Sequence, residues 1–333
     1  MSSNYPIEII PAAAISEAIW GTPALIADIT GSDRMAHIMG NLYSHRNYTL
    51  YYTRPGINQL ARTTKLANSL GIRCIVLCGE TLPNPAEIFP DNTPYSASLI
   101  SPGSGSGDGE PILDYLLNDS NTKEFSHIGY QIYRYNPDTL KLLRSRDFEE
   151  IRLGVMRGET ALAEPMIRDK EHIFIDMRSV RHSDFPDNPL RSPNGLYAEE
   201  LCQLARYAGM GQKIKNIYIF GYPSVLKPKS VSGELAAEVS WHIAEALSSN
   251  VYEDPGGNGK EDNFLRKIVS MGQEGQDLVF VSSSVTGRWW MEIPDIKTSK
   301  NHIVPCSYSD YTTACSGDIP MRWLFFFQKI NPD

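Results

Sequence analysis

Short strand-like runs alternate with helical stretches along most of this 333-residue chain, and this alternation limits the folds open to it. A short run that is apolar and rich in β-branched or aromatic residues predicts a strand. Six runs meet that description: Arg73 to Cys78, Tyr95 to Ile100, Phe125 to Gln131, His172 to Val180, Asn216 to Tyr222 and Asp277 to Ser282.

Apolar residues at helical spacing predict two helices in the second half of the chain. The first stripe, ending before Gly209, consists of Leu201, Leu204, Ala205 and Ala208. The second, within about 233 to 247, consists of Leu235, Val239, Ile243 and Ala246. Strands alternating with helices predict an α/β fold with a mostly parallel sheet covered on both faces. A chain of this length often forms one such domain, so a single domain over 1–333 is expected.

The charge and apolar patterns exclude several classes of function. Lys and Arg number 31 against 39 Asp and Glu, which gives a formal charge of −8 without any long basic run. Nucleic acid is therefore not expected as the main partner. No apolar stretch approaches the ~20 residues of a membrane span, and the first residues lack a basic segment followed by an apolar one. The five cysteines are scattered rather than arranged as a disulfide scaffold, so a cytoplasmic protein without membrane contact is expected.

Several segments resemble the ureohydrolase family, which includes arginase, agmatinase and formimidoylglutamase. From His172, HIFIDMRSVRHSDFPDNP resembles the family's strand that ends in S-F-D-x-D-x-x-D-P, and GIRCIVLCGET resembles its strand ending in G-G-x-H. KNIYIFGYPSVL and SGELAAEVSWHIAEAL resemble the next strand and the final covering helix. GRWWMEIP from Gly287 and VPCSYSDYTTACSGDIPMRW from Val304 resemble a bacterial arginase- or formimidoylglutamase-like branch. The resemblance runs from about Gly71 to the C-terminus, with 1–70 divergent and shortened, and implies an arginase-like three-layer αβα sandwich.

The resemblance also implies a hydrolase in which six ligands hold two Mn²⁺ ions, whose bridging hydroxide attacks a guanidino or formimino group. The first ligand, the His of G-G-x-H, corresponds to Thr81 here. The three ligands of D-x-H-x-D correspond to Ser101, Gly103 and Gly105, in a stretch from 94 to 107 without any Asp, Glu or His. Hydroxyls and glycines are poor replacements for carboxylates and imidazoles.

The last two ligands come from D-x-D, where Asp176 is retained and Arg178 replaces the second carboxylate. The third Asp of that motif corresponds to Arg181, and the family's substrate-orienting Glu corresponds to Gly221. Five of the six ligands are replaced, and an arginine brings a fixed positive charge to the place of a metal ion. The sequence therefore predicts that the metal site is lost and that no cofactor is bound.

The candidate ligand-binding set consists of Asp176, Arg178, Arg181, His182 and Asp184, and no residue is assigned as catalytic. Arginines in place of aspartates favour an anionic ligand at the carboxyl edge of the sheet, where α/β proteins bind ligands. The structural alternative is that Asp176 pairs with an arginine or with backbone donors, and that His182 and Asp184 only make hydrogen bonds within their loop.

Two classes of function remain open from the sequence. The first is a ureohydrolase-fold protein that is not an enzyme and binds a protein partner or an anionic small molecule, since fold and function separate readily. The alternative is an active arginase- or formimidoylglutamase-type hydrolase of linear amidines, with Mn²⁺ held by ligands placed elsewhere. Members of the family commonly form trimers or hexamers, so the resemblance also implies a homo-oligomer.

Overall fold

The computed structural model describes residues 5–11, 22–103, 111–256, 263–271 and 277–332. Contacts divide the chain into two compact units, the larger formed by Met1–Ala163 and Ile167–Asn250 and the smaller by Glu164–Met166 and Val251–Asp333. Each unit has a hydrophobic core of its own. A division by contacts does not establish independent folding, so the single domain expected from the sequence stays a prediction.

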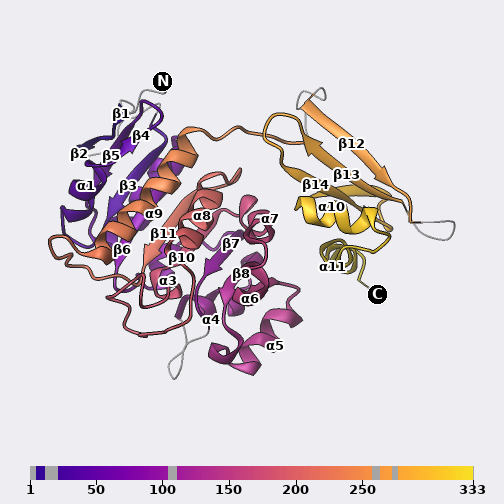
Figure 1. The fold of residues 1–333 in the computed structure, drawn as a ribbon, viewed down its shortest axis with the longest axis horizontal. Helices are drawn as coiled ribbons and strands as arrows, with labels where there is room; N and C mark the ends of the chain where they lie inside the picture. Colours follow the sequence, from indigo (N-terminus) through magenta and orange to yellow (C-terminus); the bar gives the residue numbers. More distant parts are fainter. Residues whose placement is uncertain (1–4, 12–21, 104–110, 257–262, 272–276, 333) are drawn as a thin grey trace. The chain divides into compact units, whose positions relative to one another are not determined.

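The larger unit is built on a nine-stranded sheet in which every pair of neighbours is parallel (Figure 1). In order across the sheet, the strands are β2 (Glu8–Pro11), β5 (Thr49–Thr53), β3 (Ala24–Asp28), β6 (Arg73–Gly79), β11 (Asn216–Phe220), β10 (His172–Asp176), β7 (Tyr95–Ile100), β8 (Thr122–Tyr130) and β9 (Glu149–Arg152). A separate two-residue pair joins β1 (Tyr5–Pro6) to β4 (Tyr43–Ser44). The α/β fold with a parallel sheet is confirmed.

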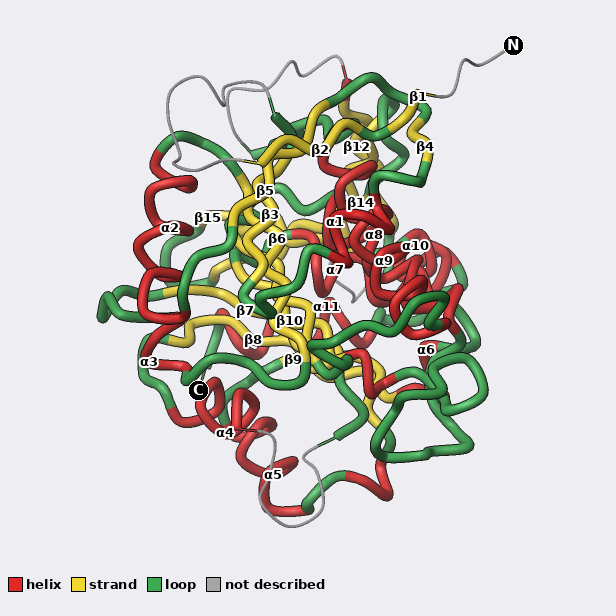
Figure 2. The backbone as a smooth tube through the Cα atoms, turned by 90° about the vertical axis from the view of Figure 1, so that its left-hand side faces the viewer, coloured by secondary structure: helices red, strands yellow, loops and turns green. Residues whose placement is uncertain are grey.

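Helices cover both faces of this sheet, as Figure 2 shows for α2 and α3 on one side and α8 and α9 on the other. The first face buries a core shared by α2 (Ile57–Ser69), α3 (Pro85–Ile88), α4 (Pro111–Asn118) and α5 (Pro137–Ser145). The remaining helices are α1 (Arg34–Met39), α6 (Leu153–Met156), α7 (Glu164–Arg168), α8 (Ala198–Gly209) and α9 (Val231–Ser248). Strands buried on both faces explain why the sequence reads as continuous apolar runs rather than as alternating ones.

The smaller unit is a four-stranded antiparallel sheet with two helices packed against it. Its strands, in order, are β12 (Phe264–Val269), β13 (Leu278–Ser283), β14 (Trp289–Asp295) and β15 (Lys300–Cys306). Residues of α10 (Tyr308–Cys315) and α11 (Met321–Ile330) complete its core around Phe280, Met291 and Trp323. The predicted strand at Asp277 to Ser282 thus exists, but it belongs to this antiparallel sheet.

The other five predicted strands lie in the parallel sheet, and both predicted helices are present as α8 and α9. The run from His172 is shorter than predicted, because the strand ends at Asp176 and a 3₁₀ turn follows over Met177–Ser179. The side chain of Asp176 closes that turn by accepting a hydrogen bond from the backbone N–H of Arg178. Across the described residues, no helix is long and apolar enough to span a membrane.

Candidate functional site

Four neighbouring strands, β6, β11, β10 and β7, carry most of the positions that the family uses for metal and substrate. Since these strands are parallel, their carboxyl ends meet at one edge of the sheet. Thr81 follows β6, Gly221 follows β11, Asp176 ends β10, and Ser101 and Gly103 follow β7. Gly105 lies outside the described residues. The observed topology therefore brings these described positions to one edge of the sheet.

Asp176 and Arg178 form a close ion pair at the end of β10. The Asp176 side chain is completely buried, and its Oδ1 accepts hydrogen bonds from the Arg178 backbone N at 2.9 Å and the Arg178 Nε at 2.8 Å. Its Oδ2 is buried without a hydrogen-bond partner in the described part of the chain. Burial raises the pKa of Asp176, and the guanidinium of Arg178 opposes that rise. This is the structural alternative considered for Asp176.

Gly221, where the family has a glutamate, packs directly against this ion pair. Its φ is +80°, a backbone conformation that favours glycine. A Cβ added there would lie 2.4 Å from Oδ1 of Asp176 and 3.1 Å from Cγ of Arg178. The ion pair thus occupies the space that any side chain at 221 would need.

Ser101 is held in a chain of buried hydrogen bonds rather than facing a ligand. Its Oγ lies 2.8 Å from Nε2 of His127, and Nδ1 of His127 lies 2.8 Å from the hydroxyl of Tyr135. Burial lowers the pKa of His127 from 6.5 to about 3, so the ring is neutral at physiological pH. A neutral, dry imidazole with so low a pKa is a weak general base, and Ser101 itself is fully buried. The group therefore fixes the strand end instead of forming an activated nucleophile.

Gly103, two residues further on, is packed against backbone. An added Cβ would lie 2.5 Å from the carbonyl oxygen of Arg134, which belongs to the 3₁₀ turn Ile132–Arg134. The neighbouring turn therefore leaves no room at 103 for a ligating side chain.

Arg181, His182 and Asp184 lie in the loop that follows, where Arg181 and Asp184 form a second ion pair. Arg181 Nε is 2.8 Å from Oδ1 of Asp184, while Oδ2 of Asp184 accepts a hydrogen bond from the Ala198 N–H at the start of α8. The Arg181 guanidinium also lies 4.1 Å from the ring centroid of Tyr197. His182 bonds through its backbone N–H to Ser192. The five candidate residues thus divide into an ion pair at the sheet edge, a second pair that supports the start of α8, and His182, which bonds within its loop.

A cavity of about 220 Å³ opens at the carboxyl edge beside Arg178 and Thr81. Its other lining residues are Glu80, Leu82, Pro83, Asn84, Pro85, Pro111, Ile112 and Phe220. Most of these side chains are apolar, and the charges are one carboxylate and one guanidinium that is already paired. Such a lining suits a small ligand with an apolar body more than a multiply charged one.

A second buried carboxylate, Asp28 at the end of β3, lies at the same edge and was not predicted from the sequence. Its Oδ2 accepts a hydrogen bond from the Tyr52 hydroxyl at 2.5 Å, and its Oδ1 accepts two from Thr30. Burial raises its pKa. A signal was present, because ALIAD ends in aspartate after an apolar run just as HIFID does at Asp176.

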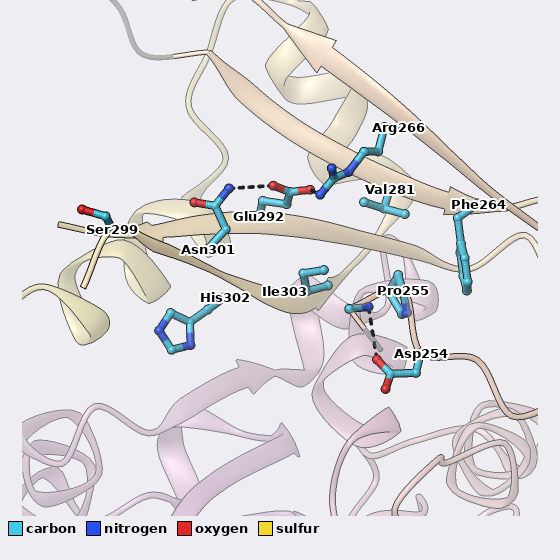
Figure 3. Close-up of a pocket in the computed structure, with 11 residues that line it drawn as sticks. Asp254, Pro255, Phe264, Arg266, Val281, Glu292, Ser299, Asn301, His302 and Ile303 are labelled. Atoms are coloured by element: carbon cyan, nitrogen blue, oxygen red, sulfur yellow. Dashed lines mark hydrogen bonds and ion pairs between the residues drawn. The ribbon is translucent and has the colours of Figure 1, made fainter. Parts of the chain in front are cut away.

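The smaller unit contains a hollow of about 960 Å³ that no sequence pattern predicted (Figure 3). Glu292 lies in its wall with only 5% of its side chain exposed, paired with Arg266 and accepting a 2.8 Å hydrogen bond from Asn301. Arg266 and Asn301 reach it from β12 and β15, on either side of β14, as Figure 3 shows. These contacts neutralise a buried charge and tie three strands together. Within the described residues of both units, no three His, Cys, Asp or Glu side chains are grouped so as to hold a metal ion.

Replacing Gly221 by alanine tests how tightly the ion pair fills the edge. Gly221→Ala is expected to destabilise the protein by about 2 kcal/mol more than Gly71→Ala, because only at 221 would the new methyl meet a buried side chain. Gly71 is a matched control, since its φ is +75° and nothing lies within 4 Å of the added Cβ. Free energies of unfolding in urea measure both. Equal losses would mean that the edge has room for a side chain.

His127 should make stability depend on pH. Its pKa of about 3 in the folded chain lies below the ordinary 6.5, so unfolding takes up a proton between these values. Its contribution is complete above pH 6.5 and declines by about 1.4 kcal/mol per pH unit as the pH falls towards 3. His127→Gln removes this proton uptake, so the stability gap between wild type and variant should narrow from pH 6 to pH 4.5. A gap that stays constant in urea unfolding would contradict the buried neutral histidine.

Comparison with known proteins gives a match at the level of structure. No protein-family model matches the chain, and no curated protein does. The formimidoylglutamase structure from Bacillus subtilis superposes with a TM-score of 0.60 at 14% identity, covering 73% of this chain and 92% of that one. Trypanosoma cruzi formiminoglutamase, solved with Mn²⁺, gives 0.58 at 15% identity, covering 72% and 97%.

The proclavaminate amidino hydrolase of Streptomyces clavuligerus is also similar, with a TM-score of 0.50 at 12% identity over 74% of this chain and 93% of that one. All three matches cover nearly the whole of the other protein and leave about a quarter of this chain outside. The bacterial branch suggested by the C-terminal segments stays a prediction. The chain has the fold of the arginase and formimidoylglutamase structures, the ureohydrolase fold.

Proposed function

We propose that this chain is a ureohydrolase-fold protein that has lost the dinuclear manganese site and acts by binding rather than by hydrolysis. The observation that carries this proposal is the ion pair between Arg178 and the buried Asp176, backed by Gly221. Asp176 is the single family ligand retained in the sequence, and its accepting oxygen is already bound twice by Arg178. A guanidinium at this distance repels a divalent cation and occupies one of the two carboxylate oxygens that could otherwise ligate it.

The other described ligand positions do not fit a pair of metal ions. Two divalent cations need several carboxylates and imidazoles around them. Thr81 offers a hydroxyl, Ser101 is engaged with His127, and Gly103 has no side chain and no room for one. This chemistry supports the loss of the site, and no reaction step is derived through manganese.

The replacements at the edge also depend on one another. Arg178 can lie against Asp176 only while position 221 lacks a side chain, and a glutamate at 221 would collide with that pair. Restoring one family residue would therefore not restore a site. This dependence between Arg178 and Gly221 supports an edge whose residues fit one another without a metal ion.

For the bound molecule, we favour a protein partner over a small anion. The anionic ligand was expected because Arg178 and Arg181 replace aspartates, but each pairs with its own carboxylate, Asp176 or Asp184. Paired cations attract an anion weakly, because the neighbouring negative charge offsets them. We place this role in the cytoplasm, which agrees with the free thiols of all five cysteines.

The alternative function is hydrolysis of a guanidino or formimino group, and the fold shared with formimidoylglutamase structures favours it. It requires metal ligands other than those assigned from the resemblance. It also predicts turnover that depends on added Mn²⁺.

Counting bound metal separates the two functions. The purified chain would be incubated with Mn²⁺, dialysed free of unbound ion and measured by elemental mass spectrometry, and then assayed with arginine, agmatine and formimidoylglutamate. The expected result is less than about 0.1 manganese per chain and no turnover, because Arg178 opposes the metal. About two ions per chain, with turnover of any of these substrates, would overturn the proposal and establish the hydrolase.

A further inference from the structure

A groove of about 440 Å³ lies at the carboxyl ends of β8 and β9, on the outermost strands of the parallel sheet. One wall is the 3₁₀ turn Ile132–Arg134 after β8, and the other is the turn from β9 into α6. The groove is lined by Tyr130, Gln131, Ile132, Tyr133, Arg152, Leu153, Gly154, Val155, Arg157 and Asn194. None of the candidate residues discussed above lines it.

Three large apolar side chains of this groove are open to solvent. Ile132 is 49% exposed, Tyr133 66% and Val155 46%. Tyr133 is also held in place, because its hydroxyl bonds to Gln131 and accepts a 3.0 Å hydrogen bond from Nδ2 of Asn194. A fixed aromatic ring beside two exposed aliphatic side chains is the kind of surface that packs against a partner.

The lining carries two guanidinium groups and no carboxylate. Arg152 is exposed at the end of the edge strand β9, and in the described chain it forms no ion pair. Arg157 is 3.2 Å from Oε1 of Glu200 and lies over the ring of Tyr197. The nearest acidic residue on β9, Glu150, is bound by Arg144 at 2.6 Å and by the Tyr130 hydroxyl. Arg157 is thus balanced by Glu200, and Arg152 gives the groove one further positive charge on a chain whose net charge is −8.

We propose that this groove docks an acidic segment of a partner protein that carries a large apolar side chain. The apolar side chain packs against Ile132, Tyr133 and Val155, and an acidic side chain next to it pairs with Arg152. Tyrosine and arginine are the residues most enriched at the centres of protein interfaces. The proposal rests on the proposed role as a binding protein and names the partner's chemistry.

Selection from a random peptide library displayed on phage tests this groove directly. The full chain is the target, and a groove variant, Arg152→Glu with Tyr133→Ala, is the comparison. A matched control, Arg62→Glu with Tyr252→Ala, makes the same changes at exposed positions that do not line the groove. All four substitutions are at exposed side chains, and circular dichroism verifies that the variants fold.

Enriched peptides are expected to combine aspartate or glutamate with an aromatic or branched aliphatic residue. Their affinity should fall about tenfold or more on the groove variant, stay within about twofold on the control, and weaken with added salt. The proposal is overturned if no peptide is enriched, if the enriched peptides lack acidic residues, or if both variants bind alike. It is also overturned if sedimentation shows that the wild type is an oligomer and the groove variant a monomer, because the groove is then occupied by a second copy of the chain.

The metal count and the peptide selection fail independently. A chain with two manganese ions that still selects acidic peptides would overturn the proposed loss of the metal site and leave the groove in place. A metal-free chain that selects no peptide would overturn the proposed groove and leave the proposed loss of the metal site in place.

Discussion

The buried charge of Asp176 is the constraint on which the carboxyl edge of the sheet depends. A carboxylate with no solvent exposure is costly unless a positive charge or hydrogen-bond donors compensate it, and Arg178 supplies both. The ion pair then fills the space at the end of β11, so that position 221 can hold only a residue without a side chain. Asn188 ties the following loop to this turn by donating hydrogen bonds to the carbonyls of Arg178 and Val180. The ion pair and Asn188 together hold the first turn of the chain that leads from β10 to α8.

At the neighbouring strand ends, too, polar side chains are compensated by partners within the chain. Ser101 is engaged with His127, and Arg181 with Asp184. Under the proposed function, side chains that are paired in this way are not available to a metal ion or a substrate. Fold and activity are separable because the sheet and its helices do not require the ligands. We therefore place the proposed binding site for a partner on an exposed surface, the groove at β8 and β9.

The central strands were predictable because each is a short run rich in apolar, β-branched or aromatic residues, and the parallel pairing of β10 with β11 brings Asp176 and Gly221 to the same edge. The pairing of Arg178 with Asp176 was one of two interpretations of Asp176 drawn from the sequence. How the other candidate residues pair was not predictable, because the path of the loop after β10 determines which side chains meet. The N-terminal strands β2, β3 and β5 were missed, although β3 and β5 are as long as the predicted strands β10 and β11. Asp28 was missed with them. The antiparallel sheet of the smaller unit depends on pairings between β14 and β15 that no local pattern reveals.

A double-mutant cycle on Asp176 and Arg178 tests the central claim most directly. Asp176→Asn, Arg178→Met and the double variant would be compared with wild type by urea unfolding at pH 7. If Arg178 compensates the buried carboxylate, each single variant loses stability and the pair shows a coupling free energy of about 2 kcal/mol or more. A coupling below about 0.5 kcal/mol, the range of independent sites, would contradict the account, because Asp176 would then be stabilised by something other than the arginine beside it.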